Sequence, residues 1–166
     1  MQDIEIAEKA FEDLRTAFEH NGYETERYLD TEHGKVIWFS ADTPPVDGEP
    51  DDEEPEWVHE AYQKRMRVWK DGNGRFLEVP PGDLSDRVED MERFLSKHAD
   101  THLREQFERG GKSRARLEAF ERALERDAAQ RHRWRKFRKE RTCERIRDWL
   151  ELQGYRLVQN GQTSSP

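Results

Sequence analysis

The stretch ERYLDTEHGKVIWFS, residues 26–40, places β-branched and aromatic side chains on both sides of a short polar segment. Such side chains favour extended strands, and Gly34 tolerates the backbone conformations that tight turns require. The pattern therefore predicts a β-hairpin with a short loop. A second β-prone segment, RFLEVP at residues 75–80, is expected to pair with this hairpin. Together these segments predict an antiparallel sheet of three short strands.

Most of the remaining chain has the spacing of amphipathic helices. Apolar side chains recur three and four residues apart in four segments: 4–18, 58–69, 88–95 and 117–124. A further helix is expected between Asp100 and Gly110, and a long one over roughly 128–152. YRLV, residues 155–158, is expected to be a last short strand. The predicted fold class is α+β: a small antiparallel three-stranded sheet (hairpin 26–40 plus strand 75–80) packed by amphipathic helices, with a helical C-terminal half.

Composition sets the expected domain organisation. The 166 residues are 33% hydrophobic and 40% charged, and they include 8 Phe, 5 Trp and 4 Tyr, so a thin, aromatic-rich core is expected. We expect a single domain over residues 1–160 and a frayed tail at 161–166. Segment 42–60 holds nine acids and four prolines but neither Lys nor Arg. A disordered acidic loop is therefore predicted at about 42–55.

The single cysteine and the absence of long apolar runs bear on the compartment. Cys143 is alone, so it cannot form an intrachain disulfide, and a reducing intracellular compartment is the simpler interpretation. The first residues, MQDIEIAEKAFEDL, carry acids where a signal peptide would carry basic and then apolar residues. No apolar run reaches the ~18 residues that would span a bilayer. We expect a cytoplasmic protein without a membrane partner.

Charge is distributed unevenly along the chain. Residues 1–100 hold 12 Lys/Arg and 27 Asp/Glu, whereas residues 101–166 hold 17 Lys/Arg and 10 Asp/Glu. The most basic segment, RHRWRKFRKERTCERIR at residues 131–147, has nine Lys/Arg and two acids. Such asymmetry indicates either a nucleic-acid partner or an internal pairing of opposite charges. The acidic loop could also act as a tethered mimic of a polyanion that masks the basic segment.

The long predicted helix combines arginine and tryptophan on one face. At 100° per residue one stripe contains six residues: Trp134, Arg138, Arg141, Arg145, Trp149 and Leu152. Three interpretations remain open. The arginine stems pack on aromatic rings while their charged groups reach water or acids at the edge of the core. Alternatively, the arginines line a groove for phosphates beside a tryptophan that stacks on bases, or they dock an acidic protein segment.

Residues with the chemistry of a catalytic or metal site are sparse. His98 and His102 have the spacing of a helical ligand pair, but no cysteine or carboxylate cluster with metal-ligand spacing lies nearby. No glycine-rich phosphate loop and no serine elbow is present. We therefore assign no catalytic residue, no metal ligand and no cofactor. Asp30, Glu32 and His33 in the hairpin turn are the one group that could converge, with Arg138 or Arg141, into an unrecognised active site.

Several motifs, taken together, resemble a known family. They are RYLDTEHGKV (27–36), RFLEVP (75–80), MERFL (91–95), LEAFERAL (117–124), RWRKFRKER (133–141) and DWLELQGY (148–155). Their types and order resemble the bacterial uncharacterised protein family UPF0158. The resemblance carries a Trp-x-x-Phe-Lys/Arg-x-Glu-Arg core at Trp134, Phe137, Arg138, Glu140 and Arg141, around which this chain is richer in arginine. It implies an intracellular bacterial protein with a small sheet and several helices, and it implies no activity.

Three functional hypotheses follow from the sequence. The first is a non-enzymatic binding or regulatory protein whose basic C-terminal helix contacts nucleic acid or another polyanion. Its candidate contact residues are Arg138, Arg141, Arg145, Arg133, Lys136 and Trp134. The second is a protein–protein adaptor in which the Arg/Trp stripe is structural and the acidic loop or the hairpin meets an unidentified partner. The third is an enzyme with a site near the hairpin turn. The sequence sets no oligomeric state.

Overall fold

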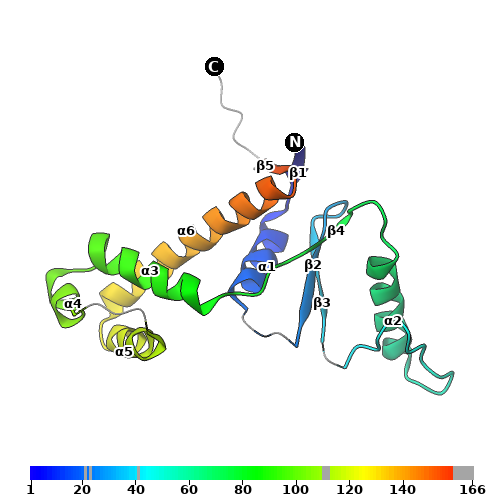
Figure 1. Ribbon diagram of the computed structural model, residues 1–166, viewed down its shortest axis with the longest axis horizontal. Helices are drawn as coiled ribbons and strands as arrows, with labels where there is room; N and C mark the ends of the chain where they lie inside the picture. Colours follow the sequence, from blue (N-terminus) through cyan, green and yellow to red (C-terminus); the bar gives the residue numbers. More distant parts are fainter. Residues whose placement is uncertain (21, 23, 41, 110–112, 159–166) are drawn as a thin grey trace. The chain divides into compact units, whose positions relative to one another are not determined.

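The computed structural model describes the chain except for residues 21, 23, 41, 110–112 and 159–166. It divides into two compact units (Figure 1). The sheet unit comprises residues 1–81 and 147–166, and the helical unit comprises residues 82–146. One domain over residues 1–160 stays a prediction. None of the helices in the described part of the chain combines the length and apolar character that a bilayer crossing requires.

The sheet unit contains the predicted three-stranded antiparallel sheet. Its strands are β2 (Glu26–Asp30), β3 (Lys35–Phe39) and β4 (Phe76–Glu78), in the order β3-β2-β4. Both partners of the central strand are therefore antiparallel to it, which confirms the predicted hairpin and third strand. Gly34 turns the hairpin with a positive φ of 58°, which an L side chain rarely adopts.

A helix lies on each side of this sheet (Figure 1). One is α1 (Glu8–Glu19), beside β3, where the ring of the adjacent His20 contacts Trp38 at 5.6 Å. The other is α2 (Glu56–Trp69), whose Arg65 side chain donates to the Glu26 carboxylate of β2. Alternate residues of a strand point to opposite faces, so Glu26, Tyr28 and Asp30 share one face of the sheet.

The first strand differs from the sequence expectation. Residues 4–18 were expected to be one helix, but Gln2–Glu5 form strand β1, in which Ile4 is buried. This strand pairs in parallel with β5 (Tyr155–Val158), and Ile4 is in register with Leu157. A single apolar residue such as Ile4 is compatible with both a helix and a strand. The pairing with β5, some 150 residues away, makes this segment a strand. The strand at 155–158 was predicted correctly.

The acidic segment contains turns but neither helix nor strand over residues 42–55. The amide of Gly48 donates to the Pro45 carbonyl at 3.0 Å, and the amide of Glu54 donates to the Asp51 carbonyl at 2.9 Å. The Tyr62 hydroxyl donates to the Val46 carbonyl at 3.2 Å, which ties the segment to α2. Disorder of this loop stays a prediction, and the predicted tail at 161–166 lies outside the described residues.

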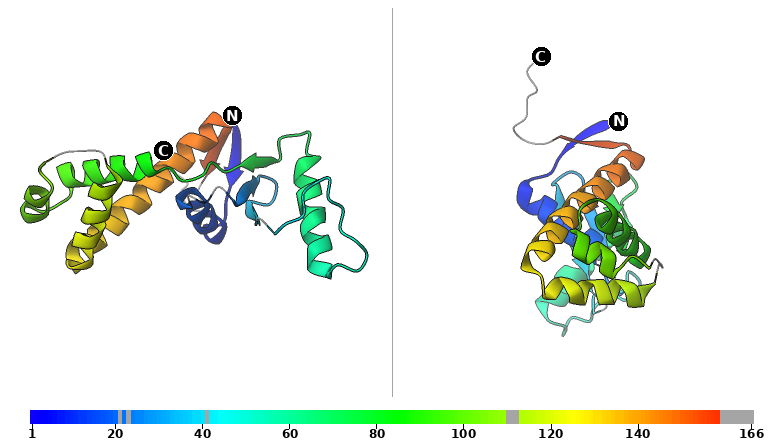
Figure 2. Two further views of the ribbon diagram at one scale, coloured as in Figure 1. Left: turned by 60° about the horizontal axis from the view of Figure 1, so that its bottom comes forward. Right: turned by 90° about the vertical axis from the view of Figure 1, so that its left-hand side faces the viewer.

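Three helices and the first part of a fourth build the helical unit (Figure 2). They are α3 (Leu84–Lys97), α4 (Thr101–Gln106), α5 (Arg114–Glu125) and α6 (Ala128–Leu152). The Asp83 carboxylate accepts from the Ser85 amide at 2.9 Å and thereby caps the N-terminus of α3. The end of α4 at Gln106 precedes the expected end at Gly110, which lies outside the described residues.

Aromatic rings form the centre of the helical unit. The ring of Trp134 lies 5.2 Å from that of Phe94 and 5.0 Å from that of Phe120, both in edge-to-face geometry. Leu117 and Leu124 of α5 are buried in the same core. Each ring stabilises the fold through the large area that it removes from water, and the edge-to-face contacts contribute further stabilisation. A thin core can therefore hold three helices together.

Candidate polyanion-binding surface on helix α6

Trp134 lies in the core and not on the surface. Its exposed fraction is 5%, and its ring packs against Phe94, Phe120 and Phe137. A base could not stack on this ring without displacing the core, so the position does not suit the predicted stacking role. Of the other predicted stripe residues, Trp149 contacts Phe18 of α1 at 5.3 Å, and Leu152 is 85% exposed.

Arg141 and Arg145 converge on one buried carboxylate. Asp90 of α3 is 2% exposed, and its Oδ1 accepts from Nε of Arg141 at 3.1 Å. Both Nη atoms of Arg145 donate to the same carboxylate, at 2.8 Å to Oδ2 and 2.6 Å to Oδ1. A buried carboxylate needs such partners, because leaving it unpaired costs several kcal/mol. The two guanidinium groups therefore join α6 to α3.

Further acceptors surround these two arginines. Arg145 donates to the Asp86 carbonyl at 3.2 Å, and Arg141 also pairs with Glu144. Burial acts to lower the pKa of Arg145, but its hydrogen bond to Asp90 and the nearby acids outweigh this and raise the pKa above its ordinary value. Both side chains are engaged in structural contacts and are only partly exposed, which makes them poor candidates for direct phosphate contact.

Arg138 occupies an intermediate position. Its guanidinium carbon lies 5.9 Å from the centre of the Trp134 ring, within the range of a cation–π contact. The side chain is half-buried. Arg138 therefore covers the edge of the aromatic core, as expected for an arginine whose stem packs on an aromatic ring.

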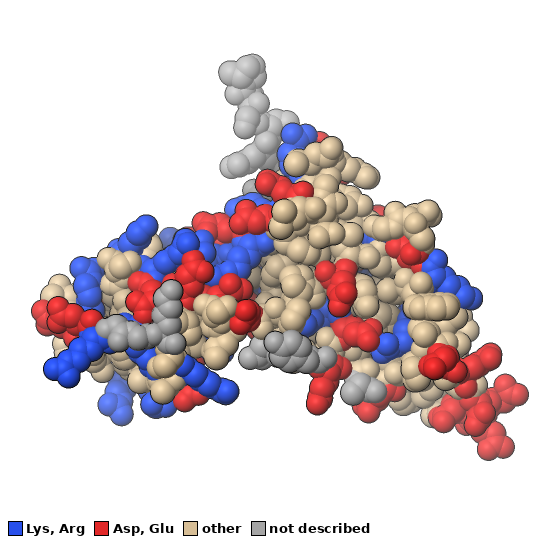
Figure 3. All heavy atoms as spheres, viewed as in Figure 1, with Lys and Arg blue, Asp and Glu red and all other residues tan. Residues whose placement is uncertain are grey.

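Four further cations of α6 face solvent. Arg133, Arg135, Lys136 and Lys139 are exposed, and within the described part of the chain none of them forms an ion pair. Arg133, Lys136 and Lys139 are three residues apart and form one row along the helix. Arg135 lies four residues before Lys139 and therefore beside this row. We call Arg133, Arg135, Lys136 and Lys139 the outer row. Lys and Arg side chains are prominent over the helical unit in Figure 3. Two residues of the outer row, Arg135 and Lys139, were not among the predicted contact residues. Their positions close to Lys136 in the basic segment are a signal that the sequence contains.

The hairpin-turn group converges, but with a different arginine from those expected. Nε and Nη2 of Arg75 donate to the two oxygens of Asp30 at 2.8 and 2.7 Å. Nδ1 of His33 lies 2.9 Å from Asp30 and 2.8 Å from Nη2 of Arg75. The Arg75 hydrogen bonds hold the pKa of Asp30 well below its usual range, although burial acts to raise it. Arg138 and Arg141, the expected partners, belong to the helical unit.

This group has the geometry of a structural network. Both oxygens of Asp30 are occupied by Arg75, and Oδ1 also accepts from the Glu32 amide at 3.1 Å. Carboxylate and imidazole atoms of Asp30, Glu32 and His33 lie within 4.8 Å of one another, a spacing a metal could bridge. A cation there would have to displace a bidentate guanidinium. The network instead fastens the hairpin turn to the start of β4.

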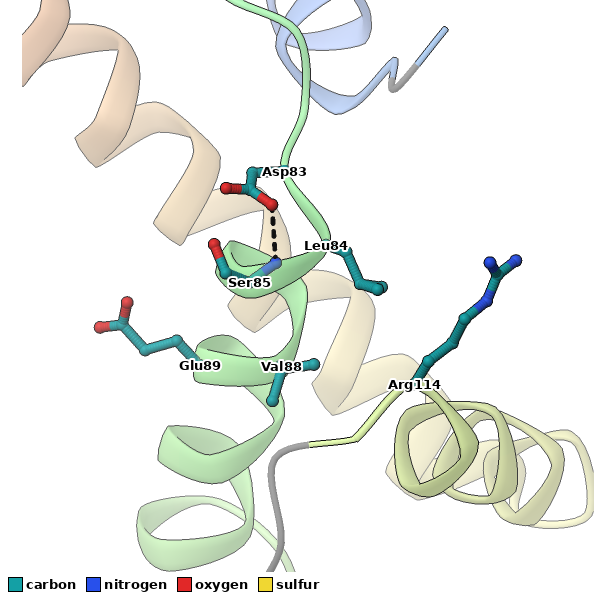
Figure 4. A pocket seen from close by; sticks show the side chains of 6 residues that line it. All are labelled: Asp83, Leu84, Ser85, Val88, Glu89 and Arg114. Carbon is teal, nitrogen blue, oxygen red and sulfur yellow. Dashed lines mark hydrogen bonds between the residues drawn. The ribbon is translucent and has the colours of Figure 1, made fainter.

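A cavity of about 490 Å³ lies at the start of α3 in the helical unit (Figure 4). Leu84 and Val88 form its apolar wall, and Arg114 of α5 stands on the opposite side (Figure 4). The charged groups at its rim are already engaged: Asp83 caps the helix, Glu89 pairs with Arg93 at 2.6 Å, and Arg114 pairs with Glu118 at 3.0 Å. The cavity thus offers apolar surface without a convergent set of free polar groups.

Comparisons with known proteins place the chain in a family but provide no function. Neither a curated protein nor a solved structure matches the sequence significantly. The model of the uncharacterised protein family UPF0158 matches residues 9–165, which include the whole helical unit, most of the sheet unit and the whole outer row. That match agrees with the motif resemblance described above. The chain belongs to the uncharacterised protein family UPF0158.

Proposed function

We propose that the chain is a non-enzymatic binding protein that contacts nucleic acid or another polyanion through the outer row of α6. The observation that supports this proposal is that α6 carries two kinds of cation, those paired with a buried carboxylate and those exposed to solvent. Arg141 and Arg145 donate hydrogen bonds to Asp90. The side chains of the outer row are exposed and form no ion pairs in the described part of the chain. A row of exposed cations on a rigid helix is an electrostatic footprint for phosphates.

The spacing of the row sets the scale of the interaction. Residues 133–139 span about 9 Å at 1.5 Å per residue, so the row can contact about three phosphates. Neutralising three phosphates of duplex DNA gives a slope of log Kobs against log salt of about −2.7. Such a small site binds without strong sequence preference. A protein with such a site could act as a regulator whose state depends on whether a polyanion is bound to α6.

The burial of Trp134 narrows the mode of recognition. Single-strand binding proteins gain about 1–3 kcal/mol per base from aromatic stacking, and Trp134 cannot supply such a contact from the core. We therefore expect charge density to decide affinity. A duplex and a single strand should both bind, and the duplex should show the steeper salt dependence.

The test measures fluorescence anisotropy of a labelled 20-mer duplex with the full chain at low salt. The variant R133Q/K136Q/K139Q removes three cations of the outer row. Its matched control, K64Q/R67Q/K70Q, removes three exposed cations on and just after α2, so both variants have the same net charge. At three contacts the wild-type affinity should fall about 40-fold between 50 and 200 mM salt.

The expected result is a loss of affinity of at least tenfold in the outer-row variant and less than threefold in the control, which corresponds to about 1.4 kcal/mol or more for the row. An equal loss in both variants would show that net charge alone matters and would overturn the assignment to α6. Absence of salt-dependent binding by the wild type would favour the adaptor hypothesis, in which the arginines are structural.

A further inference from the structure

A second cavity lies in the sheet unit, and its lining is aromatic and acidic, in contrast to the cationic outer row. Its volume is about 390 Å³, which lies within the range of small-molecule sites. It lies on the α2 side of the sheet. Its wall includes four aromatic side chains, two carboxylates and the guanidinium of Arg65, which come mainly from strands β2, β3 and β4, helix α2 and the segment after α2.

The exposed ring of Trp69 forms part of the cavity wall. In α2, Val58, Tyr62, Arg65 and Trp69 recur three or four residues apart and therefore lie on the face that packs toward the sheet. Val58 and Tyr62 are buried there, yet Trp69 is 64% exposed. The packing face of the helix thus continues past the part that the sheet covers, and a large aromatic ring faces open space.

The cavity is an environment that favours positive charge. Glu26 and Asp71 belong to its wall. Burial raises the pKa of the Tyr28 hydroxyl, and the charges of Glu26 and Glu78 raise it further, against the opposing effect of Arg65. The sheet unit as a whole holds 11 Lys/Arg and 23 Asp/Glu, a net charge of −12. Arg65 pairs with Glu26 in the wall, so Asp71 and the net charge of the unit are what favour a cation over an anion in this cavity.

Two of the aromatic rings in the cavity wall already form cation–π contacts with arginine side chains of the protein. The guanidinium of Arg65 lies 5.1 Å from the centre of the Phe39 ring, and that of Arg75 lies 4.9 Å from the centre of the Phe76 ring. Both distances are typical of cation–π contacts. Within the described part of the chain, the Trp69 ring has no such partner. Tryptophan is the aromatic side chain that attracts cations most strongly.

The carboxylates in the wall favour a cation that donates no hydrogen bonds. Both oxygens of Glu26 accept from Arg65 at 3.1 Å. Oδ1 of Asp71 accepts from the Asn73 amide at 3.2 Å, and Oδ2 accepts from the Phe76 amide at 3.1 Å. These groups supply negative charge, but most of their hydrogen-bonding positions are taken. A primary ammonium group or a metal ion would need free oxygens, whereas a fully alkylated ammonium group needs only charge and aromatic surface.

We propose that this cavity binds a small organic cation with an alkylated ammonium group, which packs on the Trp69 ring beside Tyr28 in the field of Glu26 and Asp71. The site is independent of the polyanion surface on α6. Its ligand carries the opposite charge, and its residues belong to the other unit.

The test uses choline and its neutral isostere 3,3-dimethylbutan-1-ol as probes of the full chain. The two molecules have the same shape, so a difference between them reports the charge. Binding is followed by the NMR signals of the tryptophan indole N–H groups, and the Trp69 signal is assigned from the variant Trp69→Phe. The expected result is a saturable shift of the Trp69 signal with choline and at least threefold weaker binding of the alcohol, in line with about 0.5–2 kcal/mol for a cation–π contact.

Trp57→Ala is the matched control for Trp69→Ala. Trp57 lies on the same helix and is 57% exposed, but it does not line the cavity. Trp69→Ala should weaken choline binding at least fivefold, Asp71→Asn about two- to fivefold, and Trp57→Ala less than twofold. Equal binding of the two probes, or an equal effect of the two tryptophan variants, would overturn the proposal. No saturable shift with choline would also overturn it, whatever the outcome for polyanion binding.

Discussion

The two units solve the same problem, a buried carboxylate, in different ways. In the sheet unit, Asp30 is held by one bidentate arginine, a histidine and a backbone amide. In the helical unit, Asp90 is held by two arginines one helical turn apart. The helical unit has 18 Lys/Arg and 14 Asp/Glu, a net charge of +4, in contrast to −12 for the sheet unit.

The comparison shows that the charge of a segment does not indicate which cations are free to bind. On α6, Arg141 and Arg145 face α3 and neutralise Asp90, so they contribute to the stability of the unit. Arg133, Lys136 and Lys139 point away and remain available. The position of each residue around the helix, and not the count of nine cations between residues 131 and 147, separates structure from function.

The largest effect is expected from Asp90→Asn. This change keeps the shape of the side chain but leaves two guanidinium groups without their shared carboxylate. Removing one partner of a buried ion pair costs about 3–5 kcal/mol of unfolding free energy. Urea unfolding followed by the fluorescence of Trp134, with the other tryptophans replaced, measures it in the helical unit. Glu125→Gln, an exposed residue of α5 whose carboxylate forms no ion pair in the described part of the chain, is the control and should cost less than about 0.5 kcal/mol.

A smaller effect is expected from Asp30→Asn in the sheet unit. Charge-assisted hydrogen bonds contribute about 1.5–3 kcal/mol, and this variant weakens those from Arg75. Because the folded pKa of Asp30 lies below its unfolded value of about 3.9, the wild-type advantage is complete above that pH and declines as the pH falls below it. Urea unfolding of both proteins at pH 7 and pH 3 checks this sign. A difference that grew on acidification would contradict it.

The outer row should separate binding from stability. The variant R133Q/K136Q/K139Q changes exposed side chains only, so its unfolding free energy should stay within about 0.5 kcal/mol of the wild type. Arg145→Gln should instead destabilise the helical unit by about 3 kcal/mol, because it breaks a buried pair. Thermal unfolding followed by circular dichroism distinguishes the two variants. Equal destabilisation by both would show that α6 has no distinct outer face.

The smallest effect concerns the acidic segment. Replacing Asp51, Asp52, Glu53 and Glu54 by their amides removes four negative charges from the sheet unit. The variant should bind a labelled duplex about two- to fivefold more tightly at low salt, because repulsion of the phosphates is reduced. The gain should vanish near 0.5 M salt, where screening shortens the range of charge interactions. A gain that persisted at high salt would contradict an electrostatic origin.

Local sequence signals predicted much of the fold. The hairpin, strand β4 and the bounds of α6 follow from β-branched residues, turn glycines and helical spacing. The parallel pair of β1 and β5 joins segments some 150 residues apart, which no local pattern reveals. Ile4 matches the helical spacing of the α1 segment as well as the alternation of a strand, so its position in the sequence does not distinguish the two.

The candidate site was only partly predictable. The sequence left open whether the Arg/Trp stripe of α6 faces inward, because arginine stems pack on aromatic rings in either case. A usable signal was present: Asp86 and Asp90 are four residues apart, as are Arg141 and Arg145, so two complementary pairs can face each other across two helices. The many other acids of the chain concealed this match.

The most direct test of two classes of cation on α6 is the salt dependence of duplex binding. The slope of log Kobs against log salt should be about −2.7 for the wild-type chain and should lie between about −0.9 and zero in the variant R133Q/K136Q/K139Q, which keeps only Arg135 of the outer row and leaves the fold unchanged. A variant that retains the wild-type slope would show that the phosphates are bound elsewhere, and it would contradict the account of the outer row.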